Sequence, residues 1–88
     1  MIFYFKKEEI EELDITRILH RICFSWSLSE GKRLVLQKAI KVNGKIIESL
    51  DYKIPMVLFE NNQQVEITKG KHFKNYISLG LPDLIWEL

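Results

Sequence analysis

The chain has 88 residues, of which 47% are hydrophobic and 28% charged, and its formal net charge is +1. This composition is typical of one small globular domain and excludes a disordered segment. The single cysteine excludes an internal disulfide and a cysteine-based metal site, and it fits a reducing cytoplasm. The first residues lack the order of a signal peptide, and no run approaches the ~20 apolar residues that span a membrane. We therefore expect one cytoplasmic domain over residues 1–88, with no membrane contact.

The charges are separated by sign along the chain. Residues 1–14 carry two lysines against five acidic residues, and residues 75–88 carry two acidic residues and no basic one. Residues 15–74 carry eleven lysines and arginines against five acidic residues. The net charge of the whole chain argues against a nucleic-acid binder, but this segregation favours a basic patch on its middle part.

The first fourteen residues predict two short elements. Residues 2–5 are Ile-Phe-Tyr-Phe, which indicates a strand or an apolar clamp on the core. Residues 6–13 favour one or two helical turns with Ile10 and Leu13 directed inward. Asp14 is a typical N-cap for the helix that follows.

The clearest amphipathic helix begins after Asp14. Its apolar residues fall at helical spacing: Ile15, Ile18, Leu19, Ile22 and Cys23. Because Cys23 lies on this face, we expect a buried core thiol rather than a nucleophile. Trp26 follows in the connection to the next helix. We expect it to cover the helix junction, and the alternative is an exposed platform on which a base stacks.

A second helix is predicted to begin at Ser27, because Ser27 and Glu30 have the spacing of a capping box. Its apolar face is formed by Leu28, Leu34, Val35 and Ala39. Lys32, Arg33 and Gln37 lie away from that face, toward solvent or a ligand.

The pattern then changes to that of a hairpin. Asn43 and Gly44 tolerate positive φ and predict a two-residue type I′ turn. Around this turn Ile40, Val42 and Ile46 alternate with Lys41 and Lys45. A basic helix therefore leads directly into a basic hairpin, and we expect their Lys and Arg side chains to share one side.

The remaining residues predict a loop, two strands and a tail. Residues 48–55 have no periodicity, and Pro55 argues against a central strand there. Val65 and Ile67 indicate a half-buried strand, residues 69–71 a turn, and residues 73–79 the returning strand. Residues 80–88 form an apolar tail that we expect to pack on the domain's own core or on another chain.

The order of residues from 27 to 47 resembles the small RNA-binding domain of the ribosomal protein S-four type, most closely the version at the C-terminus of bacterial tyrosyl-tRNA synthetases. That pattern is roughly Ser-Lys-Ser-Glu-Ala-Arg-Arg-Leu-Ile, a Gln-Gly-Gly-like turn, and Val-x-Val-Asn-Gly-x-x-Val. The matching residues are Ser27, Ser29, Glu30, Arg33, Leu34, Gln37, Val42, Asn43 and Gly44. Leu28 replaces a lysine of the pattern, Gly31 an alanine, and Lys38-Ala39 two glycines.

The resemblance implies an α+β domain in which two amphipathic helices, with a helix-turn-helix start, pack on a small antiparallel sheet in an S-four-like (αL) arrangement. We expect its core over residues 13–79. Residues 1–12 would then be an acidic and aromatic extension, and residues 80–88 the apolar tail.

The resemblance also implies that a basic surface contacts structured RNA, either tRNA or rRNA, with most contacts made to the backbone. The expected RNA-binding residues are Ser27, Ser29, Lys32, Arg33, Lys38, Lys41, Lys45, Lys71 and Lys74. Arg33 is the strongest single candidate, because a planar guanidinium bridges phosphate oxygens. Ser27 has a competing role as a helix cap.

The sequence offers little support for catalysis. His20 and His72 fall in different elements, neither has a carboxylate at the spacing of a dyad, and no phosphate loop or metal motif is visible. We therefore expect a non-enzymatic translation or ribonucleoprotein component that needs no cofactor and binds tRNA or rRNA. The alternative is a protein-interaction module of the same fold that docks through its aromatic N-terminus and apolar tail.

Overall fold

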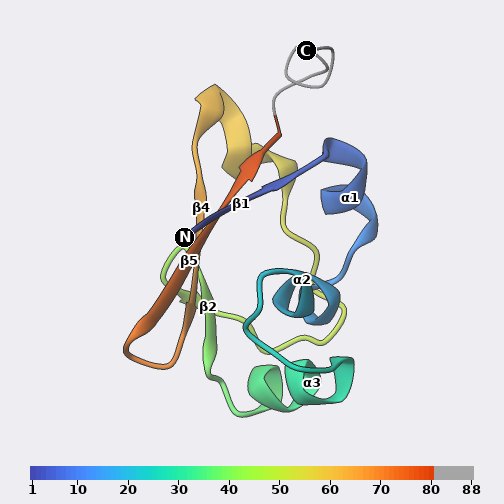
Figure 1. Cartoon of the computed structure of the whole chain (residues 1–88), viewed down its shortest axis with the longest axis vertical. Helices are drawn as coiled ribbons and strands as arrows, with labels where there is room; N and C mark the ends of the chain where they lie inside the picture. Colours follow the sequence, from blue (N-terminus) through green and yellow to red (C-terminus); the bar gives the residue numbers. More distant parts are fainter. Residues whose placement is uncertain (81–88) are drawn as a thin grey trace.

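The computed structural model describes residues 1–80, so the tail predicted to pack on a core or a partner lies, from residue 81 on, outside the described residues. In chain order the elements are β1 (Ile2–Phe5), α1 (Lys7–Glu12), α2 (Ile15–Arg21), α3 (Leu28–Leu36), β2 (Ile40–Val42), β3 (Lys45–Ile46), the 3-10 segment η1 (Met56–Asn62), β4 (Val65–Lys69) and β5 (Phe73–Leu79). Figure 1 shows α1, α2 and α3 on one side of the strands. The predicted helices and strands of residues 15–79 are therefore present, and η1 is an addition.

The strands form one sheet in the order β1-β5-β4-β2-β3. The pairs β2–β3, β2–β4 and β4–β5 are antiparallel, whereas β1 runs parallel to β5. The α+β class is confirmed, but the sheet is mixed rather than wholly antiparallel. No tight turn joins β1 to β5, because the rest of the chain lies between them, and so nothing local requires the two strands to be antiparallel.

Residues 1–12 take part in this fold. They supply β1 and α1, and through them Phe5 (3% exposed) and Ile10 (0% exposed) enter the core. Arg21 of α2 forms an ion pair with Glu9 of α1, which ties the acidic N-terminal helix to the next helix. The sheet therefore includes a strand from the segment that the sequence suggested as an extension.

Helix α2 follows the predicted apolar spacing up to Ile22. The Asp14 side chain accepts a hydrogen bond from the backbone N–H of Arg17 at 3.0 Å, so Asp14 is the N-cap, as expected. Its core residues Ile15, Ile18, Leu19 and Ile22 are all 0% exposed. The helix thus presents one continuous apolar face to the sheet.

The prediction of a buried Cys23 is wrong. Helix α2 ends at Arg21, Cys23 has a φ of +65°, and its side chain is exposed. The Cys23 N–H donates to the carbonyl of His20 at 3.2 Å, and the Phe24 N–H donates to that of Leu19 at 2.9 Å. These two bonds form a Schellman motif, whose left-handed residue turns Cys23 outward and brings Phe24 into the core.

Helices α2 and α3 pack closely because Gly31 has no side chain. A Cβ at position 31 would lie 3.2 Å from the carbonyl oxygen of Thr16, which is tighter than an ordinary contact. The predicted cap at Ser27 is confirmed, since its hydroxyl accepts from the Glu30 N–H at 3.1 Å. Glu30 in turn accepts from the N–H of Trp26 at 3.0 Å, one residue before the position that a capping box uses.

The hairpin turn is confirmed. Asn43 and Gly44 have φ values of +49° and +83°, and Val42 pairs with Lys45 across them. The Asn43 side chain also accepts from the backbone N–H of Glu66 at 2.8 Å, which fixes the hairpin to β4. Ile46 pairs with Lys41 and is 43% exposed, so the alternation of Ile40 and Val42 with the lysines does not place Ile46 on the same face as Val42.

Replacing Gly44 by valine should lower the free energy of unfolding by about 1–3 kcal/mol, because a β-branched residue resists positive φ. No atom lies within 4 Å of a Cβ placed at Gly44, so the loss would come from the backbone alone. Urea denaturation followed by circular dichroism measures it, with Gly44→Asn as the control that tolerates this φ. Equal stability of Gly44→Val and the wild type would contradict the turn.

The Asp14 cap should make stability depend on pH. Burial alone would raise the pKa of Asp14, but hydrogen bonds from the Thr16 hydroxyl and the Arg17 N–H, with the Arg17 charge, hold this pKa below 3.8. A lowered folded-state pKa means that the stabilisation is complete above the unfolded value and is lost as pH falls through the folded value. Asp14→Ala should cost about 1 kcal/mol at neutral pH.

The control for the pH effect is Asp14→Asn, which keeps a capping oxygen but cannot ionise. Thermal unfolding of the three proteins between about pH 7 and pH 2 tests the linkage. The advantage of the wild type over Asp14→Asn should shrink at the acid end. An advantage that stays constant across this range would show that the ionised cap is not the cause.

Candidate nucleic-acid interface

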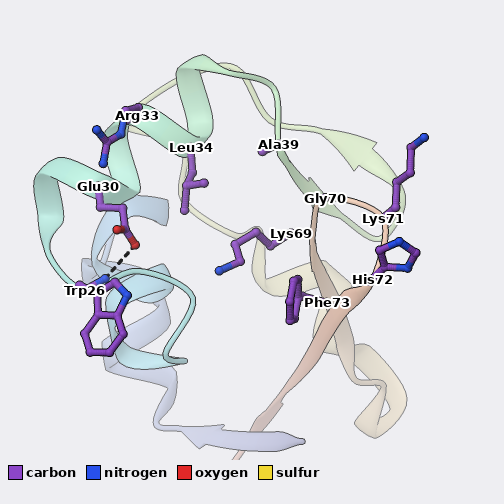
Figure 2. A pocket seen from close by; sticks show the side chains of 10 residues that line it. All are labelled: Trp26, Glu30, Arg33, Leu34, Ala39, Lys69, Gly70, Lys71, His72 and Phe73. Carbon is purple, nitrogen blue, oxygen red and sulfur yellow. Dashed lines mark hydrogen bonds between the residues drawn. The ribbon is translucent and has the colours of Figure 1, made fainter.

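A groove of about 470 Å³ lies between helix α3, the loop before it, and the turn between β4 and β5. Figure 2 shows the side chains that line it. They are Trp26, Glu30, Arg33, Leu34, Ala39, Lys69, Gly70, Lys71, His72 and Phe73. We call this feature the α3–β4 groove. Arg33 and Lys71, two of the predicted RNA-binding residues, come to it from elements far apart in the sequence.

Trp26 stands at one side of the α3–β4 groove and is 90% exposed, so the prediction that it covers the helix junction is wrong. The interior position is taken by Phe24, which is 6% exposed and belongs to the core. Because Phe24 turns inward at the end of α2, Trp26, two residues further along the chain, lies at the surface. The alternative of an exposed aromatic platform is the one that the geometry fits.

Lys69 occupies the groove although it was not among the predicted site residues. Its ammonium donates to the carbonyl of Phe24 at 3.1 Å and lies 5.5 Å from the ring of Phe24 and 5.1 Å from that of Phe73. The attraction of a cation to two ring faces and one carbonyl holds this side chain in place. A sequence signal was present, because Lys69 falls in phase with Val65 and Ile67, whose side chains face the core.

The predicted residues of the second helix lie where the sequence placed them. Ser27 caps α3, and Ser29, Lys32 and Arg33 are exposed on it. Arg33 lines the α3–β4 groove. The hydroxyl of Ser27 is already an acceptor for the Glu30 N–H, so its capping role is the one the structure displays.

Lys38 and Lys74 each have a carboxylate partner. The Lys38 ammonium lies 3.4 Å from Glu48, and that of Lys74 lies 3.4 Å from Glu66. Such exposed pairs are weak and exchange readily with solvent or another anion. They nevertheless reduce the positive potential around these two lysines.

Lys41 and Lys45 lie on opposite faces of the sheet, so the expectation that the basic residues share one side is wrong for the hairpin. Cross-strand partners point to the same face, and Lys45 pairs with the buried Val42. Lys41 pairs with Thr68, which pairs with Lys74. Lys41 and Lys74 therefore share the face away from the helices, whereas Lys45 lies at the sheet edge on the helix side.

The described residues also limit other kinds of site. No group of three His, Cys, Asp or Glu side chains within residues 1–80 is placed to hold a metal ion. None of the helices in that part of the chain has the length and apolar character needed to cross a membrane.

Comparison with known proteins agrees with the helix pair and hairpin. The S4 domain model matches residues 16–56, which include α2, α3, β2 and β3. The resemblance to the S-four type is thus confirmed over residues 16–56, which match the S4 domain family. S4 domains are generally RNA-binding modules and are not themselves catalytic.

A particular relative is the tyrosine–tRNA ligase of Ehrlichia chaffeensis. It is 31% identical to this chain over 71 residues, which make up 80% of the chain and 17% of the ligase. The chain therefore corresponds to about one sixth of the length of that relative.

Lys38 should be a destabilising residue at the end of α3. It has a φ of +60°, and its N–H and that of Ala39 close a second Schellman motif on Val35 and Leu34. Lys38→Gly should raise the free energy of unfolding by about 0.5–1 kcal/mol, because glycine adopts this φ without a Cβ penalty.

The control is Lys38→Ala, which also removes the pair with Glu48 but keeps a Cβ. Because the pair is exposed, this variant should differ from the wild type by no more than about 0.5 kcal/mol. Chemical denaturation compares the three proteins. A gain of equal size in both variants would assign the effect to the charge and not to the backbone.

Proposed function

We propose that this chain binds structured RNA, and that the surface around the α3–β4 groove is where the RNA lies. The observation that carries the proposal is that Arg33 from α3, and Lys69 and Lys71 from the β4 end of the sheet, line one groove; Figure 2 shows Arg33 and Lys71 on opposite sides of Lys69. The S4 match of residues 16–56 supports it independently. Lys32, exposed on α3 next to Arg33, extends the same basic surface.

The chemistry of these side chains favours contacts with the RNA backbone. A guanidinium such as that of Arg33 donates two parallel hydrogen bonds to a phosphate, and lysine ammoniums act as point charges. Ser29 and Ser27, at the start of α3, add hydroxyl donors near the positive end of the helix. Recognition of this kind follows the shape of an RNA helix rather than its sequence. Lys38, Lys41, Lys45 and Lys74 then act as outlying charges that strengthen binding without defining it.

Transfer RNA is the first candidate for the RNA, because the relative named above is a tyrosine–tRNA ligase. Ribosomal RNA is the second, given the S-four type of the domain. In either case we propose a non-catalytic part in translation, in the cytoplasm. The catalytic activity of the ligase belongs to that protein, of which this chain matches 17%.

Binding should weaken steeply as salt rises, since each neutralised phosphate releases condensed counterion. With about three to five phosphate contacts, the slope of log affinity against log salt should be about −2 to −4. Reversing Lys32 and Arg33 to Glu should lower affinity at least about tenfold at low salt, because two attractions become repulsions. Fluorescence titration with a tRNA and with an rRNA hairpin at several salt concentrations measures both effects.

The matched control is the reversal of Lys6 and Lys7, two exposed lysines at the start of α1 among acidic residues. This variant should bind as the wild type does. A wild-type chain without salt-dependent affinity for either RNA would overturn the proposal. The protein-docking alternative would then remain, and exposed Ile2 and Tyr4 of the aromatic N-terminus would be the side chains to test first.

A further inference from the structure

We propose that the α3–β4 groove takes one unpaired nucleobase of the bound RNA, stacked against Trp26 or Phe73. This inference rests on the proposed RNA binding and adds to it a preference for RNA with a bulged or single-stranded nucleotide. The inference rests on one juxtaposition. Two large aromatic side chains line the same groove, with cations and a carboxylate between and beside them.

The aromatic residues are the first part of the argument. Trp26 is 90% exposed and Phe73 is 61% exposed, and they are among the most exposed large apolar side chains of the described residues. In Figure 2 they stand on different sides of the groove, with the Lys69 side chain between them in this view. The backbone of Trp26 is held by its N–H bond to Glu30, so the ring is presented from a fixed point. An aromatic face exposed in this way is what a nucleobase stacks on.

The polar groups distinguish a base from a phosphate. Lys69 donates one of its three N–H groups to the carbonyl of Phe24, so two N–H groups remain for a ligand. Glu30 uses one carboxylate oxygen for Trp26, which leaves the other as an acceptor. The edge of a base carries both acceptors and donors, whereas a phosphate carries acceptors only. A carboxylate in the wall therefore favours a base inside the groove, with phosphates held beside it by Arg33 and Lys71.

The base must be unpaired to enter. Bases within an A-form helix are stacked, and their edges lie in grooves where an aromatic ring cannot stack on them. Bulged and single-stranded nucleotides expose the flat face that Trp26 and Phe73 can cover. The groove volume of about 470 Å³ lies within the range of sites that enclose small molecules, about 300–1,000 Å³.

The test uses the full chain and three RNA hairpins with the same stem: one continuous, one with a single-nucleotide bulge, and one with an abasic residue at the bulge. The wild type should bind the bulged RNA about five- to 150-fold more tightly than the other two, the effect of one stacked base. Trp26→Ala should lose this preference and Phe73→Ala should reduce it, and the quantity compared for each variant is the ratio of its affinities for the bulged and the continuous hairpin. The matched control is Tyr4→Ala, which removes an aromatic side chain that is 64% exposed on the other face of the sheet.

A second readout reports stacking directly. The chain has two tryptophans, so Trp86→Phe leaves Trp26 as the one source of tryptophan fluorescence. Its emission should be quenched by the bulged RNA and much less by the abasic RNA, which has the additional backbone residue but no base. Circular dichroism of each variant confirms that it is folded.

Three results would overturn the base site. Equal affinity of the wild type for all three hairpins would overturn it and leave the proposed RNA binding intact. The same holds if the abasic RNA binds as tightly as the bulged one, since the chain would then recognise a bend and not a base. Absence of binding to every hairpin would overturn both the base site and the proposed function.

Discussion

The end of helix α2 is the constraint on which the rest of the structure depends. Its left-handed turn at Cys23 sends Phe24 into the core and leaves Trp26 at the surface. The sheet then holds this turn in place, because Asn75 of β5 donates to the carbonyl of Ile22 at 3.0 Å and Lys69 of β4 donates to that of Phe24 at 3.1 Å. A buried carbonyl at a helix end needs such partners, and here long side chains from two strands provide them. One turn thus sets the helix junction, the position of the sheet and the shape of the α3–β4 groove.

The distribution of charge follows from the same arrangement. Glu9 and Arg21 join the acidic first helix to the basic part of the chain, while Glu48 and Glu66 lie beside lysines of the turn after α3 and of the sheet. In the groove the partner of Lys69 is a neutral carbonyl and two aromatic rings instead of a carboxylate. The positive charge of Lys69 is therefore not neutralised by its partners. Lys69 remains able to attract an anion.

Local patterns predicted most of the elements and most of the buried positions, but not the exposure of Cys23, Trp26 and Ile46. The spacing of Ile15, Ile18 and Leu19, the cap at Ser27 and the turn at Gly44 each depend on residues within a few positions of one another, and all were confirmed. The parallel pairing of β1 could not be predicted, because its partner lies more than 70 residues along the chain. The predictions for Cys23 and Trp26 failed for one reason. The residue with left-handed φ is Cys23 and not a glycine, so the sequence does not indicate the turn.

Only part of the candidate site could be predicted, because the segments that form it are far apart in the sequence. The positive charges of Arg33 and Lys71 made both residues candidates from the sequence. That both line one groove depends on tertiary packing, which local patterns do not predict. Lys69 lies before a glycine, which indicates a turn, and only its phase with Val65 and Ile67 places its side chain on the inner face of the sheet. The separation of Lys41 from Lys45 follows from the two-residue turn itself, which pairs Lys41 with Ile46. The face of each lysine in the hairpin is therefore set by the register across the turn and not by simple alternation along the sequence.

The parallel pairing of β1 with β5 sets an order for how the molecule forms. Helices α2 and α3 and the hairpin make contacts between near neighbours, which close quickly at small cost in chain entropy. Strand β1 precedes the helices in the sequence, yet Ile2 pairs with Tyr76 and Phe5 with Leu79, so it gains its partner only after the intervening elements have been synthesised. The Gly80 N–H then donates to the carbonyl of Phe5 at 2.7 Å, at the last described residue. We therefore expect the pairing of β1 with β5 to form late in folding, because the two strands are far apart in the sequence. Until it forms, the outer edge of β5 would be open to strands of other molecules.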